Sequence, residues 1–343
     1  MLVKMAKQYR RPILTFYLSA PPRRVARGAD FRTLSGKHPT AADALLDAFL
    51  RDVRARQSMV RAVLEDEEEA ERLPFIGAGK ISDGKTVLLK LLQGLLGVDC
   101  LQYRDQNDAG AAFSLLRANA EKKGVFVLLK GDLGSYHTTI DVEVFRGFAI
   151  ADDVAPFIVI NDGDAKPAWS FTLLHELVHL LLGQTGISGA CAESETERFC
   201  NDVAGEFLLP AHELEDPELH DRMDFNMVTK RIGEFARARH LSRFMVAYAA
   251  HRGGVIDRDV FGKLVSCFRQ QWRQTREDRR IQANKQEGGP NYYVVRRHRV
   301  GNALIDLAQR MMGVGALTTS KTAKILGVKP KNVQALIDVG GPS

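Results

Sequence analysis

The stretch FTLLHELVHLLLG, residues 171–183, contains the pattern HExxH within an almost continuous apolar run. A helix that is apolar all round is buried, so the stretch predicts a buried helix that ends at Gly183. His175 and His179 would lie one turn apart on one face of it, where both imidazoles can bind a single Zn²⁺. Glu176, one step round the helix, can reach a water molecule at the metal without being a ligand itself.

A catalytic zinc needs a third protein ligand and one open position. A second helix predicted over 193–210 offers Glu197, because residues spaced three and four positions after it form an apolar face that can pack on the first helix. Glu193 and the two cysteines Cys191 and Cys200 are alternative third ligands. Asn201, one turn after Glu197, can support the site by a hydrogen bond to a ligand.

These two helices together resemble the ImmA/IrrE family of zinc metallo-endopeptidases. In that family HExxH is followed by E-x-x-A-N-x-F-A-x-x-L-L-M-P, and here the second helix reads ERFCNDVAGEFLLP over 197–210. The similarity is specific over about 145–212. It implies zinc ligands His175, His179 and Glu197 and a general base Glu176. The chain departs from the family pattern at Cys200, Val203 and Leu209.

The resemblance also implies a protein substrate, typically a helix-turn-helix repressor, in a stress-response, mobile-element or toxin–antitoxin setting. The alternative is a DNA- or protein-binding transcriptional regulator with an idle or structural metal site. The presence of Glu176 disfavours this alternative, because a purely structural site has no use for that carboxylate.

Outside the site, three short runs rich in β-branched and aromatic residues predict strands over 125–131, 145–151 and 156–162. Apolar periodicity predicts helices from about 41 to 64 and over 85–97, and only helices beyond residue 222. We therefore expect an α+β fold, a gluzincin-like metallopeptidase domain with a small β-sheet and an HExxH active-site helix, followed by an all-helical C-terminal region.

Composition shifts divide the chain into five predicted segments. The segment 1–40 would be an N-terminal helix and linker that resembles a remnant of an XRE-type helix-turn-helix domain, and 41–75 an amphipathic helix. The metallopeptidase domain would span 76–215, a helical region with a basic segment 216–300, and helix-turn-helix-like helices 301–343. In the last segment the turn is expected at Gly327, between two short helices with a small shared apolar face.

The formal net charge of +6 is concentrated between Arg269 and Arg299, a segment that contains nine basic and three acidic residues. Such a block suits a solvated helix face or a weak contact with DNA through the C-terminal region. Within it, the stretch GGPNYYVVRRHR (288–299) places Tyr292, Tyr293 and His298 as candidate donors to an oxyanion, if the stretch folds over the zinc; otherwise it would be a β-like docking segment.

Composition also bounds the class of protein. With 45% hydrophobic and 26% charged residues, the chain is neither a disordered polar chain nor a membrane protein. Its four cysteines form no CxxC pair, which argues against a disulfide scaffold and a four-cysteine zinc site. We expect a cytoplasmic protein with no membrane partner.

Overall fold

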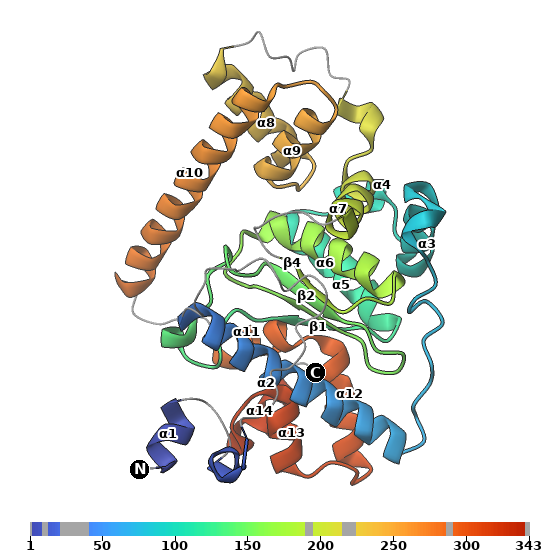
Figure 1. Ribbon diagram of the computed structural model, residues 1–343, viewed down its shortest axis with the longest axis vertical. Coiled ribbons are helices and arrows are strands. Elements are labelled where there is room, and N and C mark those ends of the chain that lie inside the picture. Colours follow the sequence, from blue (N-terminus) through green and yellow to red (C-terminus); the bar gives the residue numbers. More distant parts are fainter. Residues whose placement is uncertain are drawn as a thin grey trace.

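The structure, a computed structural model, describes residues 2–8, 13–20, 41–188, 195–214, 224–285 and 291–339 (Figure 1). Its sheet has four strands in the order β1-β3-β2-β4, namely β1 (Phe126–Leu129), β2 (Gly147–Ile150), β3 (Phe157–Ile160) and β4 (Gly186–Ser188). β1 is parallel to β3, whereas β2 is antiparallel to both β3 and β4. The three predicted strands are confirmed with shorter bounds, and β4 was not predicted.

Every residue of β1, β2 and β3 is buried. Successive side chains along a strand point to opposite faces, so both faces of the sheet are covered. Val127 and Leu129 of β1 join one core cluster, together with Ile158 and Ile160 of β3. The alternate residues of the same strands join a second cluster: Phe126, Leu128, Phe157 and Val159. The sheet therefore needs a layer of helices on each side.

One layer carries the HExxH helix. It consists of α3 (Lys85–Leu96), α4 (Cys100–Arg104), α5 (Ala109–Lys122), α6 (Lys166–Leu181) and α7 (Glu195–Leu208). The helices predicted over 85–97 and 193–210 correspond to α3 and α7, and the buried helix predicted to end at Gly183 corresponds to α6. α5 was not predicted; it begins at Asp108, whose side chain accepts hydrogen bonds from the backbone N–H groups of Gly110 and Ala111.

The opposite layer joins segments from the two halves of the chain (Figure 1). It contains α2 (Ala41–Asp66), α11 (Tyr292–Val300), α12 (Asn302–Gly313), α13 (Thr319–Leu326) and α14 (Val333–Asp338). The α13–α14 pair turns at Gly327, as predicted, and its apolar face is buried in the same cluster as α2 and the sheet. The stretch 288–299 was expected to be β-like if it did not reach the zinc. The structure instead makes its described part a helix, α11, which begins with the Asn291 cap.

A buried ion pair fixes this C-terminal layer to the rest of the fold. Arg117 and Glu121 on α5 are paired at 3.1 Å with side chains that are less than a tenth exposed. The Glu121 carboxylate accepts hydrogen bonds from the backbone N–H groups of Asn302 and Ala303, at the start of α12. Arg117 donates to the backbone carbonyls of Val127 and His298. Each buried charge thus finds several partners, as burial requires.

Beyond α7 lies a unit of three helices, α8 (Phe225–Ala238), α9 (Arg243–Arg252) and α10 (Arg258–Lys285). Their apolar faces join the core cluster that contains α6 and α7. The far end of α10 extends alongside the sheet (Figure 1). The prediction of an α+β domain followed by helices is confirmed.

At the N-terminus the structure describes α1 (Leu2–Gln8) and a 3₁₀ turn over Ile13–Tyr17. Most of the predicted linker lies outside the described residues, and a relation to an XRE-type domain stays a prediction. Among the described helices, none is both long and apolar enough to cross a membrane.

Candidate metal centre

The HExxH residues lie on α6, inside the core. His175 is 3% exposed, and Glu176 and His179 are fully buried. The two imidazoles face each other, with their Nε2 atoms 3.1 Å apart. Burying three titratable side chains in one turn of an apolar helix is unfavourable unless they find partners. The convergence of the two Nε2 atoms therefore indicates a ligand that both rings share.

The C-terminal end of α6 is held in place by the backbone of another segment. The carbonyls of Leu180 and Leu181 accept hydrogen bonds from the N–H groups of Gly77 and Gly79. Gly183 follows in the left-handed conformation, with φ +67°, and a Cβ there would lie 3.1 Å from Cα of Gly77. Glycine is required by both constraints. The helix that carries the histidines therefore ends in a fixed position.

The neighbouring helix α7 presents Glu197 to both rings. Its Oε2 lies 3.2 Å from Nε2 of His175, and its Oε1 lies 3.0 Å from Nε2 of His179. α7 packs on α6 through a buried apolar face that contains Val203, Ala204 and Phe207. The structure thus brings together the three residues that the sequence favoured as metal ligands.

These separations fit a tetrahedral metal ion. In a regular tetrahedron with ligand bonds of about 2.0–2.1 Å, two ligand atoms lie roughly 3.3 Å apart. The two Nε2 atoms lie 3.1 Å apart, and each lies 3.0 to 3.2 Å from one of the two Glu197 oxygens, so one oxygen faces each imidazole. Two nitrogens and a carboxylate oxygen are also a donor set typical of zinc. The residues present therefore fit the ion that the sequence predicted.

Cys200 lies at the same place. The ligand atoms of His175, His179 and Cys200 all fall within 4.8 Å of one another, and all three residues are buried. The other two alternative ligands, Cys191 and Glu193, lie outside the described residues. Asn201 follows on α7 and is partly buried.

The electrostatics of the cluster favour an anionic Glu197. Burial alone would raise its pKa, but hydrogen bonds and charge from His175 and His179 hold the pKa well below its usual value. Burial likewise acts to lower the pKa of His179, and hydrogen bonds with Cys200 and Glu197 raise it above its usual value. Burial raises the pKa of the Cys200 thiol. The cluster therefore holds a carboxylate that can neutralise part of a cation's charge.

Glu176 lies against the sheet. A Cβ added to Gly147, the first residue of β2, would lie 2.9 Å from Oε1 of Glu176 and 2.5 Å from Cγ2 of Thr172. Only glycine leaves room for the carboxylate beside the strand. This role of Gly147 was not predicted, although a glycine within a strand-like run often marks a close approach of another group to the backbone.

The predicted oxyanion donors are not brought to the cluster. Tyr293 donates its hydroxyl hydrogen bond to Asn332, and the His298 ring lies 6.2 Å from that of Trp169, near the start of α6. Tyr292 is half exposed at the beginning of α11. α11 packs against β1 and α14. These three residues therefore support the C-terminal layer in this structure.

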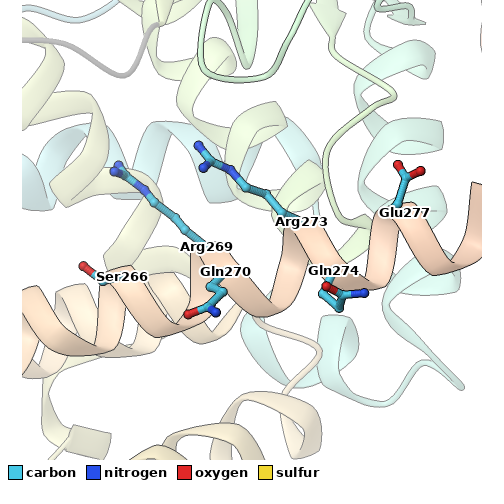
Figure 2. A pocket seen from close by; sticks show the side chains of 6 residues that line it. All are labelled: Ser266, Arg269, Gln270, Arg273, Gln274 and Glu277. Atoms are coloured by element: carbon cyan, nitrogen blue, oxygen red, sulfur yellow. The ribbon is translucent and has the colours of Figure 1, made fainter.

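Much of the basic segment is also used inside the molecule. Five of its arginines contact carboxylates or backbone carbonyls: Arg273 with Glu143, Arg276 with Asp141, Arg296 with Gly327, Arg297 with Ile337, and Arg299 with Asp162. On α10, a polar groove of about 620 Å³ is lined by Ser266, Arg269, Gln270, Arg273, Gln274 and Glu277. Figure 2 shows Arg269 and Arg273 extending from the same side of the helix. DNA binding by this segment stays a prediction.

Comparison with known proteins identifies the region that holds the cluster. Residues 120–251 match the family model described as the IrrE N-terminal-like domain, Peptidase_M78. This range runs from the end of α5 to the end of α9 and includes every residue of the metal cluster and Gly147. No match was found among curated proteins or among solved structures.

Proposed function

Because residues 120–251 are an IrrE N-terminal-like domain of the M78 peptidase family, we propose that the chain is a zinc-dependent endopeptidase that cleaves a protein substrate. The observation that carries this proposal is the convergence of His175, His179 and Glu197, with donor atoms 3.0 to 3.2 Å apart, beside the buried carboxylate of Glu176. A zinc ion held there would polarise the scissile carbonyl and activate a water molecule for attack.

The chain's own residues would then divide the work. Glu176 accepts the proton of the attacking water and delivers it to the nitrogen of the leaving amine. Glu197 contributes one negative charge, so a doubly charged cation with two neutral imidazoles keeps a net positive charge for the developing oxyanion. The apolar surroundings of α6 strengthen these charge interactions, because the local dielectric is low.

Glu176→Gln tests the proposal. The substitution keeps the size of the side chain and touches no ligand, so the protein should keep one zinc per chain and its thermal stability. Proteolysis should fall by at least about 10²-fold, because the general base is lost. An unchanged cleavage rate would refute the catalytic role of Glu176 and favour a regulator with an idle metal site.

The ligand set is tested by metal content. Glu197→Ala should bind zinc much more weakly than Asn201→Ala, because Glu197 contacts both imidazoles whereas Asn201 would act only on a ligand. The zinc retained per chain after dialysis compares the metal binding of the two variants. Equal retention in the two variants would show that Glu197 is not the third ligand.

For the substrate we propose a helix-turn-helix transcriptional repressor, in a stress-response, mobile-element or toxin–antitoxin setting. The likeness to the ImmA/IrrE family supports this choice. Incubation of the zinc-loaded protein with a purified repressor encoded beside it should yield discrete fragments, and Glu176→Gln should yield none. A repressor that stays intact with the wild-type protein would rule out this substrate.

A further inference from the structure

Helix α7 presents two metal-binding side chains to the histidine pair. Glu197 contacts both Nε2 atoms, and Cys200, three residues later on the same helix, lies with both imidazoles inside a cluster 4.8 Å across. Residues three apart on a helix share a face. The histidine pair therefore has two possible further ligands from α7, the Glu197 carboxylate and the Cys200 sulfur.

Packing alone does not account for the position of the thiol. A buried cysteine commonly behaves as a small apolar residue, and Val203, Ala204 and Phe207 fill that role on the same face of α7. Cys200 differs from them because its sulfur lies within 4.8 Å of a nitrogen of each imidazole. Sulfur is also a donor that zinc binds well, at about 2.3 Å.

We propose that the Cys200 sulfur is a fourth protein ligand of the metal, so that the resting site is closed. The inference rests on the proposed function and specifies how that site is controlled. When the thiol binds, its proton is released to solvent and its sulfur takes the position that a catalytic zinc site leaves open. Two anionic ligands also cancel the charge of a divalent cation, which makes it a weaker Lewis acid.

This arrangement has a direct functional consequence. The sulfur must leave the metal before the fourth position can accept a water molecule or the substrate. Cys200→Ala should therefore hold metal less tightly and cleave faster at saturating zinc. Alanine is also the residue that the ImmA/IrrE pattern has at this position, so the variant should fold.

Cobalt(II) in place of zinc provides a readout independent of activity. Thiolate bound to cobalt gives a charge-transfer absorption band in the near ultraviolet, and imidazole and carboxylate ligands do not. The full-length wild-type chain should show the band, and Cys200→Ala and Cys200→Ser should lose it. Cys100→Ala and Cys267→Ala are matched controls that should keep it, because both thiols lie outside the cluster.

Zinc affinity gives the second measurement. In competition with a chromophoric chelator, Cys200→Ala should bind zinc at least about tenfold more weakly than wild type, since a ligand is lost. Glu197→Ala should keep the cobalt band at lower metal affinity.

The outcomes separate the two proposals. Cobalt bound by the wild type without the band, or a band that persists in Cys200→Ala, overturns the inference and leaves the three-ligand peptidase intact. Failure of every form to bind zinc or cobalt overturns both.

Discussion

At the scale of single residues, the contact between Gly147 and Glu176 decides where the Glu176 carboxylate lies. Gly147 begins β2, and the Glu176 carboxylate occupies the space that any side chain at 147 would fill. The neighbouring strand limits escape as well, because the Val159 carbonyl would lie 3.2 Å from the added Cβ. A single missing methyl group thus gives the carboxylate its place against the sheet.

Gly147→Ala should therefore displace Glu176 while sparing the metal. We expect zinc content close to that of wild type, because His175, His179 and Glu197 are untouched, and proteolysis lowered at least about tenfold. Overpacking should also lower the free energy of unfolding by about 1–3 kcal/mol. Zinc analysis, a cleavage assay and urea unfolding measure the three effects.

A glycine in open space provides the matched control. Gly205 lies on α7, and a Cβ there would meet no atom within 4 Å. Gly205→Ala should raise the free energy of unfolding by up to about 1 kcal/mol, because alanine favours the helix. Equal loss of cleavage in both variants would contradict a specific role for Gly147.

At the scale of elements, two cations, Lys130 and Arg56, lie where β1 and α2 meet the end of α13 at Gly327. Lys130 follows β1, is 7% exposed and pairs with Asp52 of α2 at 3.1 Å. Arg56 also pairs with Asp52, at 2.9 Å. Burial, then repulsion from Arg56, lowers the pKa of Lys130 from its usual 10.5 to about 8. Holding this ammonium group charged therefore opposes folding.

The sign of the resulting pH dependence follows from linkage. Between about pH 8 and 10.5 the unfolded chain binds the Lys130 proton more readily than the folded chain, so stability from this group rises with pH in that window. Lys130→Met should remove this rise, and Asp52 would keep Arg56 as its partner. Urea unfolding measures the free energy of unfolding of both proteins. From pH 7 to pH 10, that of wild type should rise by about 1–3 kcal/mol relative to that of the variant. A constant difference between the two proteins would exclude the effect.

The elements predicted from the sequence are those with a local signal. The apolar run around HExxH predicts α6, and Gly97 and Gly327 predict the ends of α3 and α13, where both adopt the left-handed conformation. β4 was missed because it has only three residues, and its pairing with β2 depends on the fold.

In the candidate metal site, too, the residues with a local sequence signal were predicted and those that depend on packing were not. Spacing along one helix predicts His175 and His179, and the face of the next helix points to Glu197, with Cys200 left as a rival ligand. The structure brings both α7 residues to the histidines. The placement of Tyr292, Tyr293 and His298 depends on how α11 packs against β1 and α14, and no local pattern encodes that packing. Gly147 was missed because its role depends on a contact across two elements.

At the scale of the whole molecule, one face of the sheet is covered by helices from distant parts of the sequence, α2 near its start and α12 to α14 near its end. α2 and the helices α12 to α14 share one core cluster with Phe126, Phe148 and Phe157 of the sheet. These helices are therefore part of the fold that supports the metal site, although they lie outside the residues that match the peptidase family.

A chain that ends at residue 300 should consequently lose its metal site. Removal of α12 to α14 would uncover the apolar face of the sheet, including the buried rings of Phe148 and Phe157. We expect aggregation or loss of cooperative thermal unfolding, with loss of bound zinc. A chain without residues 1–20 is the control, because none of the described side chains in that removed segment is buried. This shorter chain should unfold at the wild-type temperature. A stable, zinc-binding 1–300 chain would contradict a shared core.

The same two-ended core also sets the order of events during synthesis. The ribosome releases α6 and α7, with all the donor side chains, well before α12 to α14 exist. Until those last helices emerge, one face of the nascent sheet has no cover, and such exposed apolar faces are typical targets of chaperones. The proposed peptidase centre would thus mature only after α12 to α14 have emerged, so a nascent chain that still lacks these helices would not cleave its substrate.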